Sequence, residues 1–460
     1  MTAHSWLTQA QAFRDKGTAR SLTYRRAQLH ILASAIESFE GDILDALHRD
    51  LGKPVIEAYA SEIGFVLADI RYALKHLDDW GSPQRRRTPL WLKPGSSHVH
   101  PEPYGVALII GPWNYPFALA LSPLVSAVAA GNGVCVKPSE YAPHVSGVIA
   151  RLLRDHFQQD YITAVEGDAT RARELVCQPF DKIFFTGSTA VGRLVLAAAA
   201  PNLTPVTLEL GGKSPCIICA DADLQVAARR IVQGKFLNAG QTCVAPDHVW
   251  VQAELLKPWL EHLTRTLREF YGPDPKQSPD YGRIVNPSHL NRLTAFLKQG
   301  HLECGGQYDE SDRYLAPTVL TAIPLTAPVM QEEIFGPILP VLPFEKLDDV
   351  ISHLRSQPRP LALYAFTGER ATQERLLAET HSGGVCFNDT LSHILSRDLP
   401  FGGLGESGMG AYHGKAGFDT FTHYRSVLTR SSHFDPGLAY HPSRISLVTL
   451  KRFQHFFMSN

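Results

Sequence analysis

The sequence lacks an excess of charge of either sign. Its 460 residues include 44 lysine and arginine residues against 45 aspartate and glutamate residues, and the formal net charge is -1. Proteins that bind nucleic acid usually carry a clear basic excess, because they must neutralise phosphates. The short run Arg85–Arg87, next to two prolines, is typical of a solvated loop. We therefore expect no nucleic-acid partner.

A long apolar run and a secretory leader are also missing. The first residues, MTAHSWLTQAQAFRDKG, show neither the basic start nor the apolar core of a signal peptide. The most apolar stretch, residues 117–130, is shorter than the roughly 20 residues that span a bilayer, and it predicts a buried helix. We expect a cytoplasmic protein. The last residues, KRFQHFFMSN, mix basic and aromatic side chains, which suits either contact with a membrane surface or a disordered or dimer-packed terminus.

Cysteine is present in an odd number without a regular framework. The seven cysteines are scattered along the chain, which indicates free thiols in a reducing compartment. Cys216 and Cys219 form a C-x-x-C pair, but no second pair at zinc-finger spacing accompanies it, and the apolar context predicts two small core residues of a strand. His98 and His100 lack a third ligand at suitable spacing. We expect no metal site.

The hydrophobic pattern predicts an α/β protein. Residues 21–80 are mostly helical in pattern, and five apolar residues at spacings of three and four should form one buried face: Val66, Ile70, Ala73, Leu77 and Trp80. Residues 83–103, rich in proline, glycine and histidine, break this period and predict a hairpin or arm. From residue 105 onward, five short apolar runs alternate with helical segments, and we expect them to be strands: GVALII, GVCVK, YITAV, DKIFFT and VTLEL.

This alternation predicts a doubly wound parallel sheet with helices on both faces, an architecture typical of dinucleotide binding. A second alternating region follows Gly211 and predicts a second α/β lobe, with strands at 216–219, 248–251, 318–320, 338–342 and 363–366. From residue 431 the chain is expected to be irregular. Neither an internal repeat nor a low-complexity segment is evident.

Several short motifs carry the chemistry. A G-x-G-x-x-G fingerprint is not among them, since FTGSTAVGR contains Gly187 and Gly192 at another spacing. Taken singly, each motif is a weak signal. In chain order they are GPWNYPF (111–117), VKPSE (136–140), FTGSTAVGR (185–193), LELGGKSP (208–215), NAGQTC (238–243), EEIFGP (332–337) and PFGGLGESGMG (400–410).

Together, these motifs resemble those of the aldehyde dehydrogenase superfamily over nearly the whole chain. The early segment LHRDLGKPVIEAYASEIG and the ending LPFGGLGESGMGAYHGKAGFDTFTH resemble the class 3 branch. The resemblance implies NAD(P)-dependent oxidation of aldehydes by a homodimer. Combined with the hydrophobic pattern, it predicts a cofactor-binding domain (1–82 and 104–208), a catalytic domain (209–400), an oligomerisation arm (83–103 and 419–430), a return segment (401–418) and a C-terminal tail (431–460).

The resemblance assigns catalysis to three residues. Cys243 is the expected nucleophile, because a thiolate adds readily to a carbonyl and the resulting thioester is activated for hydrolysis. Glu209 is the expected general base, and partial burial could raise its pKa toward neutrality. Asn114 is the expected oxyanion donor, acting with the backbone N–H of Cys243.

A second set of residues is expected to hold NAD or NADP. Lys137 and Glu140 match the residues that bind the adenosine ribose, which favours NAD, although Lys137 could also approach a 2'-phosphate. The helix that starts near Ser188 should face the pyrophosphate. Glu333 and Phe335 match the residues at the nicotinamide ribose and ring. The full set is Trp113, Lys137, Glu140, Gly187, Ser188, Gly192, Glu333 and Phe335.

The expected substrate entrance is apolar, which suits a medium or long aliphatic or an aromatic aldehyde better than a charged one. Arg397 is the one nearby cation that could bind a second carboxylate. Two alternatives stay open: an enzyme that transfers the acyl group to coenzyme A, and a non-enzymatic protein that retains the fold. The entrance residues are Phe65, Tyr115, Leu391, Ile394, Leu395 and Phe401.

Overall fold

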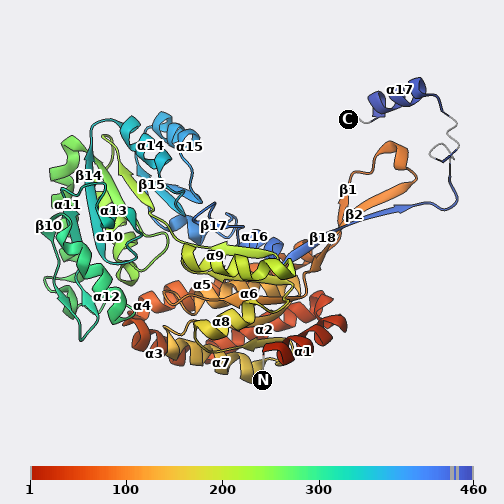
Figure 1. The fold of residues 1–460 in the computed structure, drawn as a ribbon, viewed down its shortest axis with the longest axis horizontal. Coiled ribbons are helices and arrows are strands. Elements are labelled where there is room, and N and C mark those ends of the chain that lie inside the picture. Colours follow the sequence, from red (N-terminus) through yellow and green to blue (C-terminus); the bar gives the residue numbers. More distant parts are fainter. Residues whose placement is uncertain (1–2, 436–439, 442–444, 458–460) are drawn as a thin grey trace.

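The protein consists of two α/β lobes and a projecting arm (Figure 1). The structure is a computed structural model that describes residues 3–435, 440–441 and 445–457. The first lobe is built on a six-stranded sheet, the second on a seven-stranded sheet, and the arm on a three-stranded sheet. The predicted α/β class with a doubly wound sheet is confirmed.

The sheet of the first lobe has the strand order β17-β7-β6-β3-β4-β5 and is parallel except for β17. Every residue of β3, β4 and β6 is buried, as expected for strands covered on both faces. The five predicted strands are confirmed. The bounds are β3 (Val106–Ile110), β4 (Gly133–Lys137), β5 (Ile162–Ala164), β6 (Lys182–Thr186), β7 (Val206–Glu209) and β17 (Gly408–Met409).

Four helices connect these strands, and an N-terminal helical layer packs beside them. The crossovers are α6 (Ala118–Ala130), α7 (Pro143–His156), α8 (Ala169–Val176) and α9 (Thr189–Ala199). The N-terminal helices are α1 (Ala3–Asp15), α2 (Leu22–Ser38), α3 (Glu40–Leu51), α4 (Val55–Ala58) and α5 (Gly64–Gly81). All five residues of the predicted apolar stripe on α5 are buried, which confirms its assignment to the core.

The second lobe has the strand order β10-β13-β14-β9-β8-β15-β16. All neighbours are parallel except β10 and β13. The strands are β8 (Pro215–Ile218), β9 (His248–Gln252), β10 (His301–Cys304), β13 (Thr318–Thr321), β14 (Ile338–Phe344), β15 (Ala362–Phe366) and β16 (Gly384–Phe387). The helices are α10 (Leu224–Phe236), α11 (Leu256–Tyr271), α12 (Pro287–Thr294), α13 (Pro328–Gln331), α14 (Leu347–Ser356) and α15 (Arg370–Glu379).

The two edge strands of this sheet, β10 and β16, were not predicted. Their residues are exposed or half-buried, whereas the residues of the inner strands are almost all buried. An edge strand therefore does not need the continuous apolar run on which the sequence prediction depends. A small pair, β11 (Tyr308–Asp309) and β12 (Tyr314–Leu315), lies between β10 and β13 in the chain.

The arm is an antiparallel sheet of β1 (Gln84–Arg86), β2 (Gly95–Pro103) and β18 (Thr422–Arg430). β18 pairs with β2 over nine residues, from Thr422 opposite Pro103 to Arg430 opposite Gly95, and follows the short helix α16 (Gly414–Thr420). The prediction of an irregular tail is wrong for α17 (Leu447–Phe457), which lies apart from both lobes (Figure 1). Its apolar and basic residues alternate without glycine or proline, so a helix is compatible with them.

Two features are absent from the part of the chain that the structure describes. None of the helices in that part of the chain combines the length and apolar character that crossing a membrane requires. Within the same residues, histidines, cysteines and acids do not gather in groups of three or more that could hold a metal ion. The seven cysteines are all free thiols.

Candidate functional site

Strand connectivity places three motifs at one end of the first sheet. The chain leaves β3 toward β4 on one side, whereas β6 leads to β7 on the other side, so the winding reverses between β3 and β6. In doubly wound sheets, ligands bind at the carboxyl ends of the strands at this point. Asn114 follows β3, Gly187 follows β6, and Glu209 is the last residue of β7.

Cys243 reaches the same place from the second lobe, on the segment after α10. Asn238 and Ala239 adopt left-handed backbone conformations, with φ of 52° each, which turns the chain sharply. The Gln241 side chain then ties this segment to its surroundings. It donates to the carbonyl oxygens of Asn238 (3.0 Å) and Arg283 (2.9 Å) and accepts from the backbone N–H of Val285 (2.9 Å). The cysteine is therefore presented on a well-bonded loop.

A cavity of about 250 Å³ lies where the motifs from the two lobes meet. It brings together the three expected catalytic residues, Cys243, Glu209 and Asn114, with five of the expected cofactor residues: Trp113, Gly187, Ser188, Glu333 and Phe335. The remaining lining residues are Pro112, Leu119, Thr186, Leu210, Gly211, His289 and Arg292.

Burial strongly shifts the pKa values of the ionisable groups that line this cavity. Glu209 is buried, neither of its carboxylate oxygens has a hydrogen-bond partner among the described residues, and desolvation raises its pKa well above the ordinary value. Desolvation also raises the pKa of Glu333 to about 8. The pKa of the Cys243 thiol rises to about 12, first through burial and then through the neighbouring carboxyls of Glu333 and Glu209. In all three groups burial therefore favours the protonated form.

Asn114 is buried and fixed at both its backbone and its side chain. Its Nδ2 donates to the carbonyl oxygen of Gln241 at 3.0 Å. A side-chain amide has two N–H donors, so this bond leaves a second one for a substrate oxygen in the cavity. Asn114 is thus attached to the loop that carries Cys243, although the two residues belong to different lobes.

The residues at the start of α9 suit an anionic ligand. Ser188 is the N-cap of this helix, and its side chain accepts from the backbone N–H of Val191 at 3.4 Å. A β-carbon on Gly187 would meet the Phe185 ring at 2.5 Å, so only glycine fits there. Gly192 lies one turn into the helix, where a β-carbon would meet Leu210 at 2.8 Å. Gly192 therefore permits close packing of α9 against β7 rather than direct contact with a ligand.

Lys137 and Glu140 lie at the end of β4, one strand further along the sheet. They form an ion pair in which Lys137 is buried and Glu140 is partly exposed. Among the described residues these two and Gly192 are the expected cofactor residues that do not line the cavity. Their position continues the line from the cavity across the carboxyl ends of β6, β3 and β4, as an extended dinucleotide requires.

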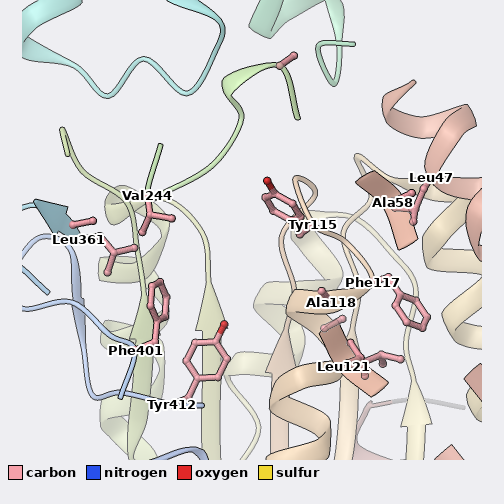
Figure 2. Close-up of a cluster of buried hydrophobic side chains, with 14 of the residues drawn as sticks. Leu47, Ala58, Tyr115, Phe117, Ala118, Leu121, Val244, Leu361, Phe401 and Tyr412 are labelled. Carbon is pink, nitrogen blue, oxygen red and sulfur yellow. The ribbon is translucent and has the colours of Figure 1, made fainter. Parts of the chain in front are cut away.

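Two of the expected substrate residues, Phe65 and Phe401, meet at the ring of His413. The Phe401 ring stacks on His413 at 5.2 Å and lies 5.8 Å from Tyr412, and Figure 2 shows Phe401 and Tyr412 side by side. Phe65 also contacts His413, at 5.5 Å. Leu391 and Ile394 are half-buried, and Leu395 is 58% exposed. The lining of the cavity, as far as the described residues define it, includes none of the six expected substrate residues.

Tyr115 is more closely tied to the reaction centre than its expected role at the entrance implies. It is buried, and its hydroxyl is 2.8 Å from the hydroxyl of Thr242, the residue before Cys243. In Figure 2, Tyr115 lies on a separate segment of the chain from Phe401 and Tyr412.

Sequence reasoning missed two polar residues of the cavity, His289 and Arg292. Trp113 packs against His289 and Phe335, with ring centroids 5.6 and 5.2 Å apart. The Nε2 of His289 is 2.7 Å from the carbonyl oxygen of Phe335, and burial lowers the pKa of this imidazole to about 4. An available signal was the N-cap Asn286 followed by Pro287, which marks the start of α12 and places residues 289 and 292 on one face.

Comparison with known proteins places these features in a family. Residues 2–427 match the aldehyde dehydrogenase family. The 4,4'-diaponeurosporen-aldehyde dehydrogenase of Staphylococcus aureus is 46% identical over 446 residues, or 96% of this chain and 97% of the relative. A dimeric, NADP-preferring aldehyde dehydrogenase of Rattus norvegicus is 45% identical, covering 91% of this chain and 92% of the relative. The solved substrate-bound Staphylococcus aureus AldH has a TM-score of 0.97 at 45% identity, covering 98% of this chain and 99% of that one.

Proposed function

Because this chain belongs to the aldehyde dehydrogenase family, as its motifs predict, we propose that it oxidises medium- or long-chain aliphatic or aromatic aldehydes through a thioester on Cys243. The oxidant is NAD or NADP, and the product is the carboxylic acid. One observation carries the proposal. A thiol, two buried carboxyls and a fixed side-chain amide, drawn from two lobes, line one cavity.

In the first step, the Cys243 sulfur adds to the aldehyde carbon, and the carbonyl oxygen becomes an oxyanion. Glu209 accepts the thiol proton as general base. The free N–H of Asn114 and the backbone N–H of Cys243 stabilise the oxyanion of the thiohemiacetal. NAD or NADP would supply the acceptor for the hydride and a cationic nicotinamide, whose charge would lower the pKa of the neighbouring thiol and carboxyls.

In the second step, water hydrolyses the thioester. Glu209, which has released the thiol proton to solvent, accepts a proton from the attacking water. The carbon–sulfur bond breaks, and Glu209 returns this proton to the leaving Cys243 thiolate as the acid is released. A carboxyl at this place argues against transfer of the acyl group to coenzyme A, because such a transfer needs no base for water. Product analysis with and without coenzyme A separates the two outcomes.

We assign the cofactor contacts by position. The start of α9, at Gly187 and Ser188, suits the pyrophosphate, since helix N-termini stabilise anions. Lys137 and Glu140 suit the adenosine ribose, and Glu333 with Phe335 the nicotinamide end, next to Cys243. Trp113 holds Phe335 in place through their ring contact.

The preference for an apolar aldehyde rests on the environment of Arg397. Its Nε donates to Asp69 at 2.9 Å, and its NH2 donates to the carbonyl oxygen of Phe65 at 3.1 Å. Its guanidinium group lies 4.6 Å from the centre of the Phe65 ring. Arg397 is therefore already neutralised and cannot readily bind a second carboxylate. The rest of the proposed entrance is the apolar group of Phe65, Tyr115, Leu391, Ile394, Leu395 and Phe401.

We propose further that the enzyme is a cytoplasmic homodimer. The rat relative is named as dimeric, and the arm (83–103 and 419–430) offers a projecting sheet for association. The other proposed units are the cofactor-binding domain (1–82 and 104–208), the catalytic domain (209–400), the return segment (401–418) and the tail (431–460). The tail is our candidate for peripheral contact with a membrane surface, since Leu447 and Val448 of α17 are exposed and Lys451 and Arg452 follow them.

Steady-state turnover of aldehydes of increasing chain length, with each cofactor, tests this function. We expect formation of NADH or NADPH, with kcat/KM rising with the length of the alkyl chain and lower for a semialdehyde that carries a second carboxylate. If no apolar aldehyde reduces either cofactor, the alternative of a non-enzymatic protein that retains the fold replaces the proposal.

A further inference from the structure

The proposed mechanism does not use one buried ion pair of the first lobe. Lys53 and Glu62 are both fully buried, and the Lys53 Nζ is 2.5 Å from a carboxylate oxygen of Glu62. A buried pair of this kind is weak evidence for stability, because desolvating two charges can cost more than their attraction returns. Its contacts are therefore a better guide to its role.

Both members of the pair hold the segment that carries Asn114. The Lys53 Nζ donates a second hydrogen bond, of 3.2 Å, to the backbone carbonyl oxygen of Asn114 and lies 4.1 Å above the ring of Tyr115. The second oxygen of Glu62 accepts from the backbone N–H groups of Phe117 (3.1 Å) and Ala118 (2.8 Å), where α6 begins. The pair thus fixes the segment at its middle and at its end.

The same segment is bonded to the cysteine loop of the other lobe. Asn238 donates through its Nδ2 to the carbonyl oxygen of Asn114 at 2.7 Å, so this carbonyl accepts from two side chains. Asn114 returns a bond from its own Nδ2 to the carbonyl oxygen of Gln241. Cys243 lies two residues after Gln241. Lys53, Glu62 and Asn238, which we call the brace, therefore set the position of the Asn114 amide relative to the sulfur.

We propose that Lys53 is a positioning residue for the reaction, acting through Asn114, and that Glu62 holds Lys53 in place for this purpose. The inference rests on the proposed role of Asn114 as oxyanion donor. Stabilisation of an oxyanion depends steeply on the placement of the donor, so a small displacement of the amide lowers the rate without removing any group that touches substrate.

The double variant Lys53→Met/Glu62→Gln tests the proposal without leaving a charge buried and unpaired. Glutamine can still accept from the N–H groups of Phe117 and Ala118, so the main loss is the bond from Lys53 to Asn114. We expect the rate of the first turnover, followed as reduced cofactor in a stopped-flow instrument, to fall by about 10- to 100-fold. KM and the cofactor Kd should change by less than about threefold, because the groups that bind both ligands are intact.

A cycle with Asn114→Ala separates this inference from the proposed function. Asn114→Ala alone should lower the first-turnover rate by about 10²- to 10³-fold, the effect of removing one oxyanion donor. In that background the Lys53→Met/Glu62→Gln change should have little further effect, since a residue that acts through Asn114 has nothing left to position. Equal losses in both backgrounds would overturn the inference. If Asn114→Ala is as fast as the wild type, the proposed function of Asn114 itself is wrong.

Two further variants complete the experiment. Asn238→Gly removes the other donor to the Asn114 carbonyl and keeps a residue suited to the left-handed backbone, so it should also slow the first turnover, by about three- to tenfold. Lys182→Met is the matched control, because Lys182 is a buried lysine at the opposite end of β6. It should leave the rate unchanged. An unchanged rate in the double variant, together with a slow Asn114→Ala, would overturn the inference and leave the proposed function standing.

Discussion

Two clusters of buried ionisable groups lie side by side in this protein, and they are built in opposite ways. In the brace, Lys53 and Glu62 neutralise each other, and both use their remaining bonding capacity on the backbone. In the catalytic cluster of Cys243, Glu209 and Glu333, burial is compensated only in part, and least at Glu209. Glu209 lacks any hydrogen-bond partner among the described residues, and its pKa is raised well above the ordinary value.

The difference shows that separate groups stabilise the structure of the site and carry out its chemistry. A buried polar group that is fully bonded makes its surroundings rigid, whereas one without partners stays available for a ligand and carries a free-energy cost. The surroundings of Glu209 are therefore where a substrate and a cationic cofactor can supply the missing interactions. The brace fixes the position of the Asn114 amide relative to the catalytic cluster, although the groups come from two lobes.

Cys243→Ala should give the largest effect and tests the catalytic cluster most directly. We expect turnover to fall by at least about 10⁴-fold, because no other group can form the thioester. The cofactor Kd should stay within about threefold, since the proposed pyrophosphate and ribose contacts lie elsewhere. Steady-state assays and equilibrium cofactor titration measure both quantities, with Cys177→Ala, at an exposed cysteine, as the control. A large loss of cofactor affinity would contradict the assigned role.

Glu209→Gln should slow both steps that use this base, and the second step, deacylation, the more. Glutamine has nearly the same shape but cannot accept a proton from water, so we expect deacylation to slow by about 10²- to 10⁴-fold. Intact-protein mass spectrometry after mixing with aldehyde and cofactor should then show an added acyl group on the protein. If the variant deacylates at the wild-type rate, another group is the base for water.

The sequence predicted the parts of this molecule that depend on local pattern. The five parallel strands of the first sheet and the stripe from Val66 to Trp80 were predictable, because burial in a sheet or along one helix face leaves a pattern in the sequence. Edge strands such as β16 leave a weaker period and were missed. The helix α17 was missed because the tail was judged by its mixed composition.

The residues of the candidate site also fall into predictable and unpredictable ones. Cys243, Glu209 and Asn114 stand in motifs that a family resemblance identifies, and the structure brings these residues to one cavity. Lys53 and His289 could not be found in this way, since their contacts depend on how distant segments meet. Lys53 is 61 positions from Asn114, and no spacing in the sequence links them.

The pH dependence of the alkylation rate of the Cys243 thiol measures how strongly burial raises the pKa of this group. With its pKa raised to about 12 and no ligand bound, the thiolate fraction should rise about tenfold for each pH unit across the neutral range. Alkylation by iodoacetamide, followed on the Cys243 peptide by mass spectrometry, should therefore speed up by about a hundredfold between pH 7 and 9. A plateau below pH 9 would mean that the free enzyme already stabilises a thiolate.

The smallest expected effect is on thermal stability. It is measured by comparing variants of one carboxyl from each cluster, Glu333 and Glu62. Burial raises the pKa of Glu333 to about 8, whereas the ordinary value is 4.5. Between these values the folded protein holds a proton that the unfolded chain has lost. The stability that the protonated carboxyl contributes is thus complete below about pH 4.5 and is lost as the pH rises through 8. Relative to wild type, the Tm of Glu333→Gln should rise between pH 5 and pH 9, by on the order of 1–3 °C.

Glu62→Gln should change the Tm in the opposite direction, because it leaves the Lys53 ammonium buried without its counter-charge. Breaking such a pair costs about 3–5 kcal/mol, so the Tm should fall by several degrees at both pH values. Differential scanning calorimetry of the two single variants beside wild type makes the comparison, and Lys53→Met/Glu62→Gln should recover most of the loss. If Glu333→Gln instead lowered the Tm at pH 9 as Glu62→Gln does, Glu333 would be a paired, supporting group, and the division between the brace and the catalytic cluster would not hold.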